Sequence, residues 1–418
     1  MSKKKTVVFL EPKGTILEVI RAASQRGYHV IALSSDQSLL NVPAPYDTAI
    51  ALINEVYPAK GWMNDSEISK MISEIEKFDV VGVYAGMDSC AYALTRFREH
   101  FKLRTTSPEA MLNTLNKFRL RRALVNAKLS KLKNFDALET ITALKNMQWP
   151  FSGAAYFKPV HGSFSAFVKR CENLDNIRDA IAAWESKTGS PKYLSDYLSA
   201  GEFHIEESFE GELLSVEGIS SGGVFKVLGL LSRILYSKNP VVEMGSCFPY
   251  PHPLAEKIVS LVARAHEVLG LTDGPTHTEV IVNPAGEVEI IDLNPRFVGA
   301  DVLQSINHAF EIKVEEVLLD WALSNNIVVP KGHRKFSCLQ YFLPPAVDTL
   351  ESVRFPVDST IRFTSTFISP GSNIESQERQ IDYLGCYLTV GSSFDAALRK
   401  SNELRSGIVI NEKYGAVY

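Results

Sequence analysis

Cysteine is scarce in this sequence, and its spacing argues against the sites that cysteine usually forms. The 418 residues include five cysteines, at positions 90, 171, 247, 338 and 386. They are odd in number and far apart, with no C-x-x-C pair and no histidine at ligand spacing. We therefore expect reduced thiols and no structural zinc site.

Long apolar runs and a surplus of basic residues are also missing. The first apolar stretch, TVVFL, ends at Glu11 and is too short for the core of a signal peptide. No run approaches the length that crosses a membrane. Lys and Arg total 44 against 48 Asp and Glu, a net charge of -4, which argues against a general nucleic-acid binder. We expect a cytoplasmic protein that binds neither nucleic acid nor membranes.

What is present is an ordinary globular composition, with 45% hydrophobic and 22% charged residues, in a chain long enough for two or three domains. The apolar runs TVVFLE, HVIALS and DVVGVYAG alternate with helical patterns, which predicts a parallel sheet with crossover helices over residues 1–110. Gly14 follows the first run, but no G-x-G-x-x-G motif is present, so dinucleotide binding is weakly indicated.

The pattern changes after residue 110. Ser107 is a plausible N-cap and Pro108 a first helical residue, so we expect one amphipathic helix over 107–129. From Ala154 the segments are mostly strand-like and predict a largely antiparallel middle. The tail adds strands and a helix capped near Ser392 or Ser393. The predicted class is therefore α/β at the N-terminus followed by α+β.

The stretch TEVIVNPAGEVEIIDLNPR, residues 278–296, carries acids in an apolar hairpin. Simple alternation puts Asp292 and Asn294 on the face of Val288 and Ile290, where an unpaired carboxylate is costly. A loop of even length places Glu279 opposite Asp292, whereas an odd loop points the acids apart. Two facing carboxylates and an amide suit magnesium. The alternative is that these residues only cap a strand end before a proline.

Two lysines elsewhere in the sequence bear on whether the hairpin acids bind a metal and phosphates. Lys158 ends an apolar strand and is followed by PVHGSFS, a small polar turn that can close over phosphates. An ordinary exposed hairpin is the alternative. Lys117 lies beside Arg119, Arg121 and Arg122, which in isolation indicate a solvated basic face.

Taken in order, these features resemble the ATP-grasp superfamily, and within it the L-amino acid ligases, which join two amino acids into a dipeptide. The resemblance covers most of the chain. It includes the segments IEESFEGELLSVEG and VVEMGSCFPYP and ends in H-x-E and D-x-N-P-R. It implies an N-terminal domain over 1–110, an ATP-grasp domain over 111–310 with a lid at about 150–205, and a C-terminal α+β domain over 311–418.

The resemblance also implies roles for particular residues. Four groups of residues would hold ATP. The phosphates would be contacted by Lys117 and Lys158, and a lid loop with His161, Ser163 and Ser165 would close over them. Adenine would be held at a hinge formed by Glu206, Glu207, Ser208 and Phe209, and the ribose hydroxyls by Glu212. Magnesium, as two ions that Mn²⁺ could replace, would be bound by Glu279, Asp292 and Asn294. Arg296, together with Lys158, would stabilise the phosphorylated intermediate, and a homodimer is implied.

Substrate choice is implied by Glu243, Ser246 and Arg296. Glu243 would bind an amino-acid ammonium, with pairing to Arg233 as the alternative. Ser246 stands where relatives often carry histidine, which predicts extra room. Glutamate is also commoner than aspartate at position 292, although aspartate remains a competent ligand. His277 could be catalytic, but hydrogen bonding inside a strand is the favoured interpretation.

The implied reaction is activation of an amino acid carboxylate by ATP as an acyl phosphate, followed by attack of a second amino acid's amine. No Ser-His-Asp or Cys-His arrangement indicates a covalent enzyme intermediate. Two alternatives stay open: a carboxylase-type enzyme that activates bicarbonate, and a non-catalytic module that binds ATP or an amino acid. Retention of both acids, Asn294 and Arg296 favours catalysis.

Overall fold

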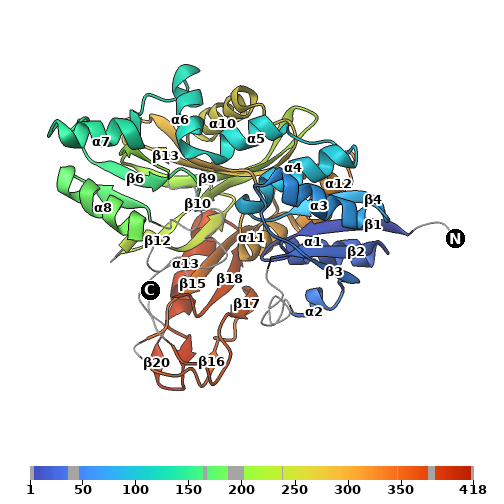
Figure 1. The fold of residues 1–418 in the computed structure, drawn as a ribbon. Helices are drawn as coiled ribbons and strands as arrows, with labels where there is room; N and C mark the ends of the chain where they lie inside the picture. Colours follow the sequence, from blue (N-terminus) through green and yellow to red (C-terminus); the bar gives the residue numbers. More distant parts are fainter. Residues whose placement is uncertain are drawn as a thin grey trace.

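The computed structural model of the protein describes residues 4–35, 47–162, 167–186, 202–237, 239–345, 347–374 and 382–415. Figure 1 shows the N-terminal strands on one side, the region of α7 (Ala137–Lys145) and α8 (Leu174–Ser186) on the other, and the C-terminal sheet below both. Within these ranges, no helix is both long and apolar enough to cross a membrane.

The N-terminal region is a four-stranded parallel sheet in the order β3-β2-β1-β4. Its two central strands are almost wholly buried, because helices cover both faces of the sheet. The predicted parallel α/β fold is confirmed. The elements are β1 (Lys5–Leu10), α1 (Ile16–Gln25), β2 (His29–Ser34), α2 (Asp47–Ile50), β3 (Glu55–Pro58), α3 (Asp65–Ile75), β4 (Asp79–Ala85), the 3-10 helix η2 (Asp88–Cys90) and α4 (Ala91–His100).

The single helix expected over 107–129 is wrong, because the chain forms two helices, α5 (Pro108–Leu115) and α6 (Lys117–Asn126). Ser107 caps α5 as predicted, its Oγ accepting from the Ala110 amide at 3.2 Å. The break is at Asn116, whose backbone is extended and whose side chain caps the Arg119 amide at 3.0 Å. Lys117 therefore begins a helix rather than lying in the middle of one.

The segment expected to form a lid, about 150–205, lies in a small sheet of the order β5-β8-β6-β7 with its own apolar core. This sheet, called the lid below, also includes β5 and α7, which precede residue 150. Its inner end is attached to α6, since the Lys117 amide donates to the Val160 carbonyl at 2.9 Å. The elements are β5 (Asn134–Asp136), α7 (Ala137–Lys145), β6 (Ala155–Pro159), β7 (Lys169–Cys171), α8 (Leu174–Ser186) and β8 (Phe203–Glu207).

The central sheet is antiparallel, in the order β10-β9-β13-β14. One face packs against α6 and α10 around a shared apolar cluster. Gly211 lets the segment between lid and sheet pass the hairpin, because a Cβ there would lie 2.2 Å from the Val282 carbonyl oxygen. The elements are β9 (Glu212–Ser221), β10 (Val224–Ser232), α10 (Ala255–Leu269), β13 (Gly274–Val282) and β14 (Val288–Asn294).

The C-terminal sheet is antiparallel in its described pairs, with the order β11-β12-β15-β18-β17. Ser393 caps α13 as expected, accepting from the Ala396 amide at 3.1 Å. The α+β expectation for the rest of the chain is thus confirmed. The elements are β11 (Ile234–Tyr236), β12 (Asn239–Phe248), α11 (Ala300–Phe310), α12 (Val314–Ala322), β15 (Phe336–Phe342), β16 (Val353–Arg354), β17 (Ile361–Thr366), β18 (Gly385–Gly391), α13 (Phe394–Arg405), β19 (Val409–Ile410) and β20 (Tyr414–Gly415).

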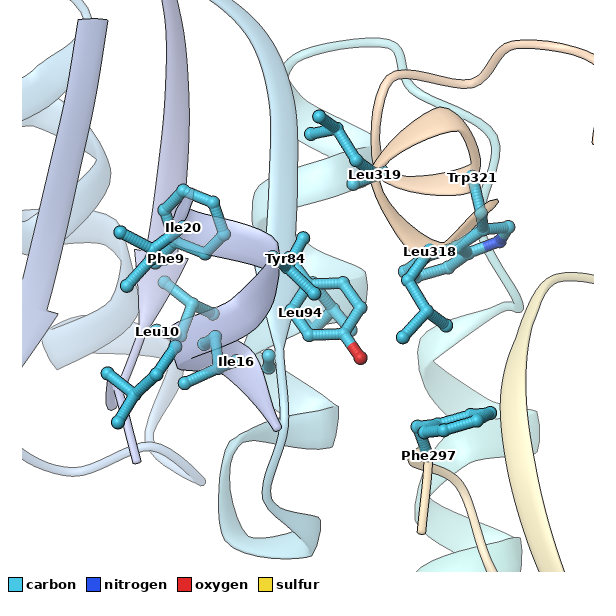
Figure 2. Close-up of a cluster of buried hydrophobic side chains, with 14 of the residues drawn as sticks. Phe9, Leu10, Ile16, Ile20, Tyr84, Leu94, Phe297, Leu318, Leu319 and Trp321 are labelled. Atoms are coloured by element: carbon cyan, nitrogen blue, oxygen red, sulfur yellow. The ribbon is translucent and has the colours of Figure 1, made fainter. Parts of the chain in front are cut away.

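Helix α12 connects the C-terminal half of the chain to the N-terminal sheet. Figure 2 shows Leu318 and Trp321 of α12 beside Tyr84 of β4, with Phe297 below them. The rings of Tyr84 and Trp321 meet edge to face, with centroids 6.0 Å apart. Because Phe297 belongs to the same buried cluster, the chain just after the hairpin is fixed against the N-terminal sheet.

Candidate active site

The hairpin brings its two acids together by a route that simple alternation missed. Val282 pairs with Val288, so the connection over 283–287 has odd length, which alone would point the acids apart. However, Val280 pairs with Ile290, while Glu279 pairs with Asp292. One additional residue, Ile291, therefore lies in β14 as a bulge and restores the facing pair.

The same bulge reverses the face on which the hairpin's polar residues lie. Val288, Ile290 and Leu293 pack into the apolar cluster under the sheet. Asp292 and Asn294 alternate with Leu293 and so lie on the other face. The expectation that they share the face of Val288 and Ile290 is wrong. The acids therefore avoid the apolar core, where an unpaired carboxylate would be costly.

Each hairpin acid holds a protein cation. The Lys117 Nζ lies 2.5 Å from Asp292 Oδ2, and Arg233 Nη2 lies 3.2 Å from Glu279 Oε1. Burial alone would lower the pKa of Lys117, but the charge and hydrogen bond of Asp292, with the charges of Asp88 and Glu279, together raise it. Burial would raise the pKa of Glu279, but the His277 hydrogen bond and the Arg233 charge hold it well below its ordinary value.

The oxygen atoms at the hairpin suit a magnesium ion. Glu279 and Asp292 face each other across the strands, and Asn294 adds an amide two residues further on the same face. Among the described residues, no three His, Cys, Asp or Glu side chains form a metal cluster. A magnesium site here would depend on two carboxylates and an amide, with phosphate oxygens from a nucleotide completing the shell.

His277 is hydrogen-bonded inside the sheet, which agrees with the favoured interpretation. Its Nδ1 lies 2.6 Å from Glu217 Oε1, and its Nε2 lies 3.4 Å from Glu279 Oε1. Burial lowers the pKa of His277, but the Glu217 and Glu279 carboxylates together raise it to about 9. Glu217 is wholly buried in β9 and was not singled out in the sequence. An acid inside the apolar run LLSVEGISS was the available signal.

Glu243 has the protein partner that the sequence offered as the alternative. Its carboxylate pairs with Arg233, and its carbonyl accepts from the Tyr383 hydroxyl. Because Arg233 also contacts Glu279, one buried guanidinium joins the candidate substrate acid to the candidate metal acid. Ser246 lies in the packed sheet with 1% of its surface exposed.

The lid lysine is held by a buried acid. Lys158 Nζ lies 2.7 Å from Glu206 Oε1, and Arg121 Nε donates to Glu206 Oε2 at 2.7 Å. Burial would raise the pKa of Glu206, but the charges of Arg121 and Lys158 hold it well below its ordinary value. Arg121 is therefore buried, unlike the solvated basic face that the sequence indicated, whereas Arg119 and Arg122 are exposed. The available signal was its position in the helical pattern: Arg121 lies four residues after Lys117 and three before Leu124, on the same face of a helix.

The expected hinge connects the lid to the central sheet. The Glu207 amide donates to the Lys133 carbonyl and the Ser208 amide to the Ala154 carbonyl, each at 2.9 Å. Phe209 is half-buried between the two sheets' ends. Glu212 opens β9 and accepts from the Tyr250 hydroxyl. The predicted adenine and ribose residues thus lie along one short connection.

The expected lid loop is only partly described. Burial, together with the nearby charges of Lys117 and Arg119, lowers the pKa of His161 to about 4, so this side chain stays neutral. Ser163 and Ser165 lie outside the described residues.

Arg296 contacts the N-terminal sheet. Its Nε donates to Asp88 Oδ2 at 3.0 Å, and Nη1 donates to the Phe297 carbonyl at 3.1 Å. Asp88 follows the carboxyl end of β4, the edge where parallel sheets bind ligands. The burial of Phe297 shown in Figure 2 keeps Arg296 at this edge.

Comparisons with known proteins agree with this geometry. Residues 154–304 match the family model of the ATP-grasp domain. This chain carries an ATP-grasp domain. The curated relative alanine–anticapsin ligase of Bacillus amyloliquefaciens is 21% identical over 283 residues, which are 63% of this chain and 59% of that enzyme. The chain therefore spans about three fifths of that relative's length.

Solved structures share the whole architecture. An L-amino acid ligase from Bacillus licheniformis superposes with a TM-score of 0.80 at 18% identity, covering 99% of this chain and all of that one. The biotin carboxylase domain of 2-oxoglutarate carboxylase from Hydrogenobacter thermophilus, solved with MgADP and bicarbonate, gives 0.70 at 14% identity, covering 100% and 92%. The ATP-grasp fold, and the resemblance to L-amino acid ligases stated from the sequence, are confirmed.

Proposed function

We propose that this ATP-grasp protein is an ATP-dependent ligase that joins the carboxylate of one amino acid to the amine of another. The observation that carries the proposal is the register of the hairpin, which sets Glu279 directly opposite Asp292 beside Lys117. Such a facing acid pair suits magnesium-bound phosphates. Similarity to alanine–anticapsin ligase and to an L-amino acid ligase favours amino acids as the substrates.

In the first step, a carboxylate oxygen of the first amino acid attacks the γ-phosphorus of ATP. The bond to the bridging oxygen breaks, giving an acyl phosphate and ADP. Glu279, Asp292 and Asn294 would hold magnesium, which when bound offsets the negative charge of the phosphate oxygens. Lys117 and Lys158 would contact the phosphates, and the hinge at 206–209 with Glu212 would hold the nucleoside.

In the second step, the neutral amine of the second amino acid attacks the acyl carbon. Inorganic phosphate leaves, the nitrogen loses a proton, and an amide bond remains. Arg296 would stabilise the charge on the acyl phosphate oxygens, and Asp88 keeps its guanidinium in place. Closure of the lid would protect the acyl phosphate from hydrolysis.

The test is phosphate release from ATP with Mg²⁺, measured with single amino acids, with pairs of amino acids and with bicarbonate. We expect release that depends on amino acids and a product whose mass is that of a dipeptide or related amide. Release that depends only on bicarbonate would establish the carboxylase alternative. ATP binding without release under every condition would establish a non-catalytic module. Sedimentation of the same protein checks the proposed homodimer.

A further inference from the structure

Arg121 is a buried arginine that joins three parts of the ATP-grasp domain. It lies on α6 with 2% of its surface exposed. Its Nε donates to Glu206 at 2.7 Å, Nη1 donates to Ser130 Oγ at 3.0 Å, and Nη2 donates to the Ile290 carbonyl at 2.5 Å. A planar guanidinium can make all of these contacts at once, whereas an ammonium cannot.

The first connection is to the lid lysine. Glu206 accepts from Lys158 through one carboxylate oxygen and from Arg121 through the other, and all three side chains are buried. The carboxylate is therefore fixed on both sides. The position of the Lys158 ammonium follows from the position of Glu206, and so from Arg121.

The second connection is to the hairpin bulge. Ile290, whose carbonyl accepts from Arg121, immediately precedes the bulged Ile291. That bulge is what turns Asp292 to the polar face, opposite Glu279. A donor from α6 at this carbonyl fixes β14 where the strand changes register.

We propose that Arg121 is a positioning residue that keeps the lid lysine Lys158 and the hairpin acid Asp292 in a fixed relation to each other. This inference rests on the proposed function, because it assumes that those two residues act on ATP and Mg²⁺. Loss of Arg121 changes both nucleotide binding and the magnesium requirement, although Arg121 is not among the residues proposed to bind either one.

The test compares Arg121→Met and Arg121→Lys with Arg122→Met, which alters an exposed arginine on the same helix. Two quantities are measured by calorimetry without amino acids: the Kd for ATP at saturating Mg²⁺, and the Mg²⁺ concentration for half-maximal ATP binding. We expect Arg121→Met to raise both about tenfold or more, since small misplacements of binding groups have large effects. Arg121→Lys should restore ATP binding through Glu206 but leave the magnesium requirement raised, and Arg122→Met should change neither.

The outcomes separate this inference from the proposed function. Values within about twofold of the unaltered chain in both Arg121 variants, with only a lower Tm, would show a purely structural residue and overturn the inference. A higher Kd for ATP in both variants with an unchanged magnesium requirement would also overturn it. If Arg121→Met does not fold, the Arg121→Lys result decides by the same criteria. Failure of the unaltered chain to bind ATP would instead overturn the proposed function itself.

Discussion

Two lysine–carboxylate pairs in this domain differ in their surroundings. At the hairpin, Lys117 and Asp292 lie 2.5 Å apart with 17% and 22% of their side chains exposed. In the lid, Lys158 and Glu206 lie 2.7 Å apart with 10% and 4% exposed, and Arg121 contacts the same acid. A partly hydrated pair can exchange one partner for another cation, whereas separating a buried pair leaves an uncompensated charge. We infer that Asp292 is an exchangeable ligand and Glu206 a fixed support.

The largest effect should come from removing the exchangeable charge. Asp292→Asn keeps the side-chain volume, so folding should be preserved, but the rate should fall about a hundredfold or more through lost stabilisation of phosphate charge. Turnover and Tm are measured in parallel. The matched control is Glu287→Gln, which changes an exposed acid in the hairpin turn. Near-normal turnover of Asp292→Asn would contradict magnesium binding at this residue.

The next comparison separates Arg296 from Lys117. Arg296→Met should lower kcat more than ATP binding, because the charge of Arg296 matters most as charge develops in the transition state. Lys117→Ala should mainly raise the KM for ATP, since its Nζ would contact ATP phosphates. ATP titrations and turnover of both variants check this. The opposite result, in which Lys117→Ala mainly lowers kcat and Arg296→Met mainly raises the KM for ATP, would mean that each residue has the role assigned here to the other.

A smaller and more specific effect is expected at Glu243. If it binds the ammonium of the first amino acid, Glu243→Gln should raise the KM for that amino acid and leave the KM for ATP unchanged. Its pairing with Arg233 gives the competing account. If Glu243 serves only to pair with Arg233, Glu243→Gln should lower Tm, while the KM for the first amino acid and the KM for ATP both stay the same. The Arg233 guanidinium would keep Glu279 as a partner, which should allow the variant to fold.

The sequence indicated which residues are candidates for the site more readily than how those residues are arranged. The hairpin acids and Lys158 were singled out because apolar strands that end in charged residues are locally recognisable, whereas the role of Lys117 was implied only by the family resemblance. The bulge at Ile291 was not predictable from alternation, since it depends on pairing with β13 and on the donor from Arg121. Burial of Arg121 was missed for the same reason: its partners Glu206 and Ile290 are distant in sequence.

Helix boundaries differ in the same way, because some follow from residues nearby in the sequence and others depend on tertiary contacts. Caps at Ser107 and Ser393 were predictable because each depends on a side chain and an amide three residues away. Asn116, which ends one helix and caps the next, was read as a helix interior because both halves have helical patterns. Attachment of Lys117 to the Val160 carbonyl of the lid fixes that break, and no local pattern reports it.

The last prediction contrasts His204 in the lid sheet with His277 in the hairpin. His204 is paired with Lys158 in the lid sheet and is fully buried. Burial outweighs the charge of Glu206 and, together with the charges of Lys158 and Lys117, lowers the pKa of His204 to about 3. An unfolded histidine titrates near 6.5, so below that pH the unfolded chain binds a proton that the folded chain refuses. The free energy of unfolding should therefore fall as pH drops from 6.5 towards 3, by about 1.4 kcal/mol per pH unit for this group.

His277 should have the opposite sign, because the folded chain keeps its proton up to about pH 9 and loses the associated stability as pH rises from 6.5 towards 9. Denaturant unfolding from about pH 5.5 to 8.5 should show His204→Gln flattening the acid side of the profile and His277→Gln the alkaline side. His266, whose pKa burial lowers to about 3, preserves part of the acid slope in both variants. Parallel profiles for the unaltered chain and both variants would show that neither charge state differs between the folded and unfolded chains.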